Sequence, residues 1–142
     1  FTQVMKLYGL NKEMGSYIRK DIEHWIEAEL NWELVPNEIC EMELLPGVFI
    51  HNWGSGHAFG MMGLRIMLKK IGAVILASDA LAVEANMGPP VRMPRVPYDT
   101  LGYARTAEQI LKLKRLYNAK VWCGHDEKQF DCLIKSDAGY YE

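Results

Sequence analysis

Apolar residues recur three and four positions apart in two parts of the chain. Between residues 13 and 30 this spacing predicts an amphipathic helix, for which Asn11 is a suitable N-cap. The same spacing returns after Asp99, another suitable N-cap, and predicts a helix over residues 99–117. Charged residues fill the positions between, so each helix is expected to bury one face and expose the other.

Short apolar runs elsewhere predict strands. Turns between them are marked by Pro46–Gly47 and by the KKIG sequence at 69–72. The run AVILAS at 73–78 is apolar throughout, which is typical of a strand buried on both faces. The expected extended segments are Trp32–Val35, Glu41–Leu45, VFIHN at 48–52, Met62–Leu68, AVILAS at 73–78 and AKVWC at 119–123.

Two segments fit neither pattern. The stretch GSGHAFG at 54–60, called the glycine corner below, carries His57. The stretch 86–99 contains four of the six prolines and is expected to be an irregular loop, because proline disrupts helix and sheet hydrogen bonding alike. Loops of this length within a compact domain are often functional.

Composition and charge narrow the class of protein. The 142 residues, 49% hydrophobic and 24% charged, fit a single compact domain, and the predicted helices and strands make its expected fold class α/β (α+β). A net charge of -2 offers no electrostatic footprint for nucleic acid or for an anionic membrane. No apolar run approaches the roughly 20 residues of a membrane helix, so neither a polyanion nor a membrane is the expected partner.

The cysteines and the first residue bear on the setting of the chain. Cys40, Cys123 and Cys132 are too few and too irregularly spaced for a disulfide framework or a structural zinc site, so a reducing, cytoplasmic location is expected. The chain begins at Phe1 rather than at a methionine. We expect this to reflect a cut, processed or incompletely given polypeptide.

Three candidate metal ligands occupy similar positions in the predicted fold, just after a strand. His57, Asp79 and His125 each follow a predicted strand, directly or after a short glycine-containing turn. Strand ends on one edge of a sheet can bring such side chains together. Imidazole and carboxylate groups bind zinc, iron or manganese, and a carboxylate can bridge two cations. Spacing alone leaves open the simpler interpretation that these loop residues are only solvated.

The order of the motifs suggests a family. GSGHAFGMMGLRI at 54–66, LASDA at 76–80 and VWCGHD at 121–126 resemble the C-terminal half of the metallo-β-lactamase superfamily, most closely its N-acyl homoserine lactone lactonase branch. In that branch the corner reads TPGHxPGHxSL, the next strand ends in DA and the last one in GHD. The likeness extends from about Asp21 to Cys132.

This resemblance implies a dinuclear metallohydrolase. His57 would ligate one divalent ion, His125 the other, and Asp79 would bridge the two and serve as the catalytic carboxylate. The ions would be zinc, with iron or manganese as alternatives. The implied reaction is hydrolysis of a lactone, cyclic amide or related carbonyl substrate by a metal-held hydroxide.

The family's HxHxDH motif is missing from these 142 residues. Three ligands would leave two ions under-coordinated, so the resemblance implies a companion chain, or a missing N-terminal half, that supplies HxHxDH. The chain would then be half of an αββα sandwich, active as a heteromer, with a large apolar interface.

Smaller departures concern the substrate. Ala82 stands where the lactonases carry a tyrosine, and Met61 stands where the corner's second histidine is usual. Tyr98 and Tyr103 are candidates to replace that phenol, and Trp53 is a candidate pocket residue beside the corner. The Ala82 departure favours other chemistry on the same fold, such as a thioesterase, a C–N hydrolase or a diiron redox enzyme.

The missing motif leaves a further alternative, a non-catalytic chain for assembly or binding. For the remaining polar residues simpler roles are expected. His51 is expected to be structural or merely exposed, and His24 to lie on the surface. Cys123 and Cys132 are expected to be packed thiols. For Asp126 two interpretations stay open, orientation of a ligand or capping of the next turn.

Overall fold

The computed structural model describes residues 18–95 and 97–141, which divide into two compact units between Glu38 and Ile39. In the first unit α2 spans Arg19–Glu27, inside the range expected for a helix, whereas residues 13–17 and Asn11 lie outside the described residues. The second unit contains β1 (Glu41–Leu45), β2 (Val48–Gly54), β3 (Met61–Leu68), β4 (Gly72–Ser78), the 3-10 helix η1 (Glu84–Met87), α3 (Thr100–Leu116), β5 (Lys120–Cys123) and α4 (Glu127–Asp131).

The extended segment expected at Trp32–Val35 is wrong, because these residues form no strand. A strand is stable only when a partner strand pairs with its backbone, and the described sheet begins at β1. The ring of Trp32 instead packs edge-on against Trp25, with 6.0 Å between the ring centroids. Trp32 therefore makes a local aromatic contact instead of pairing in the sheet.

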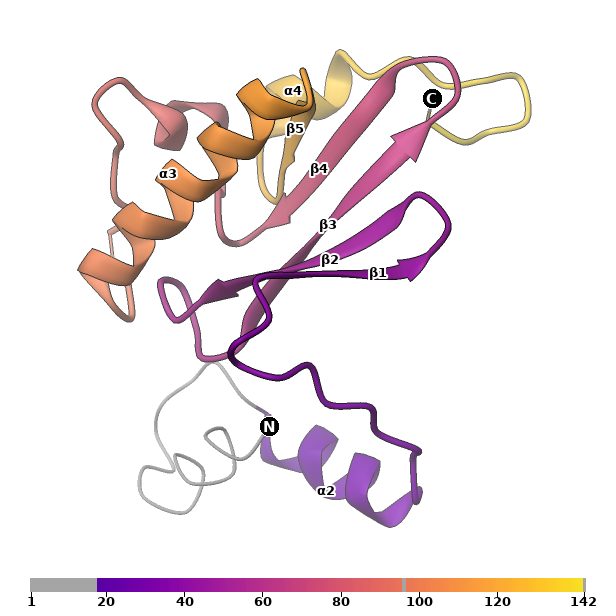
Figure 1. The fold of residues 1–142 in the computed structure, drawn as a ribbon, viewed down its shortest axis with the longest axis vertical. Coiled ribbons are helices and arrows are strands. Elements are labelled where there is room, and N and C mark those ends of the chain that lie inside the picture. The colour runs from indigo at the N-terminus through magenta and orange to yellow at the C-terminus, as the bar shows by residue number, and fades with distance from the viewer. Residues whose placement is uncertain (1–17, 96, 142) are drawn as a thin grey trace. The chain divides into compact units, whose positions relative to one another are not determined.

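The second unit is built on one five-stranded sheet in the order β1-β2-β3-β4-β5 (Figure 1). The first four strands form an antiparallel meander, and β5 pairs parallel to β4. A parallel neighbour needs a crossover connection, which here contains η1, the proline-rich loop and α3. As a result β2, β4 and β5 run in the same direction and end at the same edge of the sheet.

One face of the sheet packs against α3 and forms the core. Tyr103, Ala107 and Ile110 of the helix lie against Trp53, Ile75 and Ala77 of the strands. Tyr103 and Ile110 are almost completely buried. Because side chains alternate along a strand, the neighbouring positions point to the other face. That face carries Val74, which is fully buried, and apolar side chains that are only partly buried, namely Ile50, Leu64, Ile66, Leu76 and Trp122.

Gly63 shows how tightly the core is packed. It lies on β3 opposite His51, beneath the indole ring of Trp53. A Cβ atom added at Gly63 would overlap the indole nitrogen. Only a residue without a side chain fits at this position, which explains a glycine in the middle of a strand.

His51 lies in the buried face of β2, stacked on Trp53 with 5.0 Å between the ring centroids. Its Nε2 lies 3.3 Å from Oε2 of Glu41, an atom that also pairs with Arg65 at 3.2 Å. The guanidinium of Arg65 is itself held between the rings of Phe49 and Tyr117. The structural role expected for His51 thus agrees with its position.

Burial lowers the pKa of His51, an effect that Glu41 opposes and Arg65 reinforces. The unfolded chain therefore takes up a proton on this ring near pH 6.5, while the folded chain still excludes it. Stability is complete above that pH and falls below it, by at most about 1.4 kcal/mol per pH unit. Urea unfolding at a series of pH values should show this slope in the wild type and a smaller one in His51→Gln. His24→Gln, at an exposed position, should keep the wild-type slope; equal slopes in His51→Gln and wild type would contradict the assignment.

Within the described residues, no helix has the length and apolar character needed to cross a membrane. The three cysteines are free, and Cys123 is half-buried. The expectation of a packed thiol is wrong for Cys132, which is exposed, as is Cys40.

Candidate metal site

The first element of the site is the glycine corner that follows β2. Its backbone is held by the start of α3, because Asp99 donates its N–H to the carbonyl of Gly56 at 3.1 Å and accepts a hydrogen bond from the hydroxyl of Ser55 at 3.1 Å. Asp99 also caps α3 by accepting the N–H of Gly102. The hydrogen bonds that the carboxylate accepts from Gly102 and, to a smaller extent, from Ser55 lower the pKa of Asp99. The corner that presents His57 is therefore tied to a helix end.

Gly56 allows this close approach. A Cβ atom at that position would lie 2.6 Å from the Cα atom of Tyr103, nearer than atoms of the folded chain can come. One turn further along α3, the hydroxyl of Thr106 donates a 2.6 Å hydrogen bond to the carbonyl of Trp53. The corner and the helix therefore behave as one packed unit.

The second and third elements are the exits of β4 and β5. Asp79 follows Ser78, the last residue of β4, and His125 follows β5 through Gly124. Their segments run side by side, since the N–H groups of Gly124 and His125 donate to the carbonyls of Leu81 and Ala82. The parallel pairing of β4 with β5 is what brings these exits together.

The three predicted ligands meet at this edge. Nε2 of His125 lies 2.6 Å from Oδ1 of Asp79, and Nε2 of His57 lies 3.7 Å from Oδ2 of the same carboxylate. His57 and Asp79 are each a little over one-third exposed, and His125 is 69% exposed. Each oxygen of Asp79 therefore faces one imidazole, at a place that solvent can reach.

This arrangement fits a bridging carboxylate in part. Two ligands on one tetrahedral zinc ion lie roughly 3.4 Å apart, which is close to the His57–Asp79 distance. His125 instead makes a direct hydrogen bond to Asp79, and its Nε2 must be the donor because a carboxylate only accepts. The described residues contain no group of three or more His, Cys, Asp or Glu side chains that could hold a metal ion. The chemistry of the donors fits, but their number is too small.

The aromatic residues expected to contact substrate separate into two groups. Trp53 and Tyr103 are 3% and 1% exposed and belong to the hydrophobic core. The substrate contact expected for these two residues therefore does not agree with their positions. The sequence allowed either a core or a pocket position for these two residues. Because α3 packs on the sheet, both side chains lie in the core. Tyr98 is 41% exposed and packs against Phe59 of the glycine corner, with 4.4 Å between the ring centroids.

Cys123 is no nucleophile in this structure. Burial, and secondarily the nearby carboxylates of Asp126 and Glu84, raises the pKa of its thiol to about 11. The thiol is therefore protonated at neutral pH, and only a thiolate attacks readily. His24 is exposed on α2, as expected.

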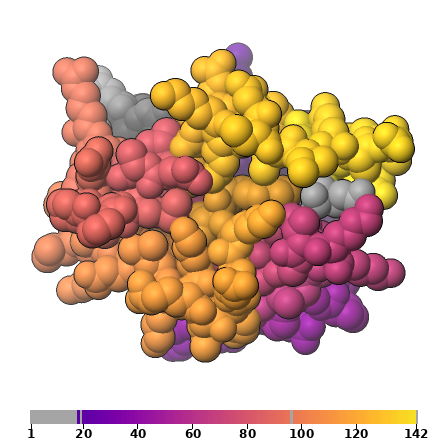
Figure 2. All heavy atoms as spheres, turned by 90° about the horizontal axis from the view of Figure 1, so that it is seen from above, coloured from indigo at the N-terminus to yellow at the C-terminus, as the bar shows by residue number. Residues whose placement is uncertain are grey.

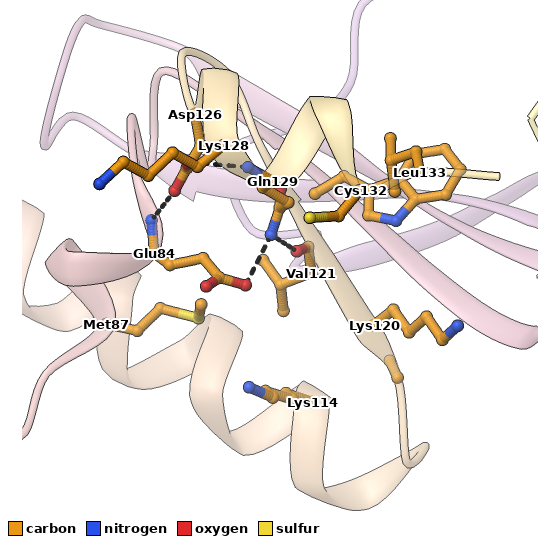
Figure 3. A pocket seen from close by; sticks show the side chains of 12 residues that line it. Glu84, Met87, Lys114, Lys120, Val121, Asp126, Lys128, Gln129, Cys132 and Leu133 are labelled. Carbon is orange, nitrogen blue, oxygen red and sulfur yellow. Dashed lines mark hydrogen bonds between the residues drawn. The ribbon is translucent and has the colours of Figure 1, made fainter.

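Sequence reasoning missed a polar network that joins the segment after β4 to the segment after β5 (Figure 3). It consists of Glu84, Asp126 and Gln129, which line a surface hollow of about 560 Å³ together with apolar side chains such as Met87 and Leu133. The hydrogen bonds from the backbone of Glu84 and of Gln129 lower the pKa of Asp126. The three-residue spacing of Asp126 and Gln129 is typical of a helix N-terminus, but nothing in the sequence indicates that Glu84, 42 positions before Asp126, joins them.

The hollow lies where the end of the chain meets the segment after β4. In Figure 2 the C-terminal residues, in yellow, lie against residues of the 80s, in rose, and against α3, in orange. A second hollow of about 300 Å³ borders the site itself, since Ser78 and Gly124 line it beside Leu76, Trp122 and Phe130.

Comparisons with known proteins identify relatives in sequence and in fold. The chain is 42% identical over its full 142 residues to N-acyl homoserine lactonase AiiB of Agrobacterium fabrum and, equally, of Rhizobium rhizogenes. It spans about half of the length of these curated relatives, 51%. No protein-family profile matches the chain.

Solved structures show the same fold. An N-acyl homoserine lactone hydrolase with the product N-hexanoyl-L-homoserine bound at its catalytic metal centre superposes with a TM-score of 0.62 and 22% identity. The match covers 72% of this chain and 39% of that one. A quorum-quenching N-acyl homoserine lactone lactonase matches with the same score and identity, over 72% of this chain and 40% of its own. The chain is therefore similar in sequence to N-acyl homoserine lactonases, and it shares its fold with a solved N-acyl homoserine lactone hydrolase.

Proposed function

We propose that this chain is the part of a metal-dependent hydrolase that supplies His57, Asp79 and His125 to a dinuclear site acting on a lactone. The observation that carries the proposal is the pairing of each Asp79 oxygen with one histidine, at 2.6 and 3.7 Å. The 42% identity to N-acyl homoserine lactonases supports a small lactone as substrate. A cyclic amide or a related carbonyl compound would need the same chemistry.

In this proposal His57 and His125 bind one ion each and Asp79 bridges them. Bound divalent ions lower the pKa of a coordinated water molecule and polarise a carbonyl group. Zinc suits imidazole and carboxylate donors, and iron and manganese accept them too. The chain's own task is to hold these donors at one solvent-accessible edge, which the glycine corner and the exits of β4 and β5 accomplish.

The remaining ligands would come from outside these 142 residues. A companion chain or half with the HxHxDH motif would complete the coordination, in keeping with the 51% of its relatives that the chain spans. The partly buried apolar face of the sheet, with Ile50, Leu64 and Ile66, supports this proposal. Packed against a second sheet, it would form the centre of an αββα sandwich.

Tyr98 is the proposed replacement for the phenol that the lactonases place at the position of Ala82. It is exposed and lies against Phe59, two residues from His57 along the chain.

Because Ala82 cannot donate a hydrogen bond to a carbonyl or a leaving group, a second candidate function is other chemistry on the same fold. This would be hydrolysis of a thioester or of a C–N bond, or a diiron redox reaction. A panel of these substrates, tested with zinc and with iron, distinguishes the candidates.

Native mass spectrometry of the purified protein tests the proposal first, because one spectrum reports both companion chains and bound metal. We expect a heteromer, or a longer polypeptide, that carries two transition-metal ions. A species of this chain alone, without metal and without hydrolytic activity, would overturn the hydrolase proposal and favour a non-catalytic role in assembly.

A further inference from the structure

The carboxylate of Asp126 makes two hydrogen bonds with different consequences. Oδ1 accepts the backbone N–H of Gln129 at 3.1 Å, which caps α4. Oδ2 accepts the backbone N–H of Glu84 at 2.7 Å. Capping explains only the first bond. The second one reaches across from the segment after β5 to the segment after β4.

The amide of Gln129 adds three bonds to this connection, two of which, to Val121 and Glu84, are drawn in Figure 3. Its Oε1 accepts the N–H of Cys123 at 2.7 Å, and its Nε2 donates to the carbonyl of Val121 and to Oε1 of Glu84, each at 2.9 Å. The amide thus uses an acceptor and both donors. It joins the end of β5 to the same Glu84 that Asp126 holds.

The bonds among Glu84, Asp126 and Gln129, called the bracket below, connect the two segments that carry Asp79 and His125. Near their beginning the segments are joined by the side chains themselves, at 2.6 Å, and along their length by the backbone bond from His125 to Ala82. Glu84 and Asp126 close the far end. If the bracket opened, the 69% exposed imidazole of His125 would have few other contacts to keep it beside Asp79.

We propose that Asp126, together with Gln129, is a positioning residue that sets the imidazole of His125 against Asp79. Its relevance to catalysis rests on the proposed function, but the positioning itself is a property of the metal-free chain. The two interpretations of Asp126 that the sequence left open are then both part of its role: one oxygen caps α4 and the other orients a ligand.

Asp126→Asn and Asp126→Ser separate these roles. Asparagine and serine are good N-caps, so α4 should persist, but neither supplies a second acceptor for the N–H of Glu84. Gln129→Met, of similar length and without hydrogen-bonding groups of comparable strength, opens the bracket from the other side. Glu127→Gln, at an exposed neighbouring position, is the matched control.

The first readout is the His125 imidazole in the metal-free chain, followed by long-range ¹H–¹⁵N spectra at a pH where imidazoles are neutral. In the wild type and the control we expect the Nε2–H tautomer, because Nε2 donates to Asp79. In the three variants we expect ring nitrogen shifts that indicate a mixture of tautomers, while circular dichroism stays unchanged. A wild-type His125 spectrum in Asp126→Asn and Gln129→Met would overturn the proposal and leave Asp126 as a cap only.

The second readout is zinc affinity of the complete protein, measured by competition with a chelator. We expect about tenfold weaker binding in the three variants and none of this loss in Glu127→Gln, since residues behind metal ligands typically change affinity by about 10–100-fold. If the complete wild-type protein binds no zinc, the proposed function fails while the His125 spectra still decide the positioning. Unchanged zinc affinity in all variants would count against the positioning role alone.

Discussion

Asp79→Ala is expected to abolish metal retention and hydrolysis in the complete protein. Asp79 is the one described side chain that faces both His57 and His125, with one oxygen toward each ring. Its removal takes a ligand and a negative charge from both proposed ions at once. Because loss of residues behind the ligands already weakens binding by about 10–100-fold, loss of the bridge should exceed about 100-fold. Metal content after desalting and the rate of lactone opening are the two measurements.

Asp137→Ala is a matched control, since it also removes one exposed carboxylate but lies in the turn near the end of the chain. It should retain wild-type metal content and activity. Full activity with normal metal content in Asp79→Ala would sink the assignment of the site, whereas equal losses in both variants would show that the effect is not specific to Asp79.

Gly124→Ala is expected to weaken both the fold and the site. A Cβ atom at Gly124 would lie 2.8 Å from the carbonyl carbon and oxygen of Ser78, which are backbone atoms and cannot rotate away. The two strand exits must then separate, and with them Asp79 and His125. Overpacking of this kind costs about 1–3 kcal/mol. Urea unfolding measures that loss, and zinc competition measures the accompanying damage to the site.

Gly139→Ala is the comparison for this variant. Nothing lies within 4 Å of a Cβ atom added there, but its φ of +85° makes alanine strained, so some stability should be lost. Both variants should therefore have a lower free energy of unfolding, but only one of them should disturb the metal site. Zinc affinity should fall only in Gly124→Ala. An unchanged free energy of unfolding and unchanged zinc affinity in Gly124→Ala would mean that the exits of β4 and β5 are not packed as closely as described.

Local patterns in the sequence accounted for most of the regular elements. Helical spacing after Asp99 corresponds to α3, and the apolar run 73–78 corresponds to β4, because a buried face leaves its period in the sequence. The candidate ligands could be named for a related reason. His57, Asp79 and His125 lie at predicted strand ends, and their motifs occur in the order typical of one family.

Pairing and burial could not be obtained from local patterns. Trp32–Val35 had the composition of a strand but no partner strand, and the positions of Trp53 and Tyr103 along the chain allowed a pocket role beside the more usual core role. Such outcomes depend on which segments meet, and spacing along the chain carries little information about contacts between distant segments.

The sequence by itself determined the residue types of the site, the glycines that permit its turns and the family to which its motifs are similar. Only the tertiary structure decided that β2, β4 and β5 end at one edge, so that both histidines face Asp79. It also decided that Asp126 joins Glu84 to α4. The reason is physical: a hydrogen bond between residues 42 positions apart depends on the path of the whole intervening crossover, which no local pattern encodes.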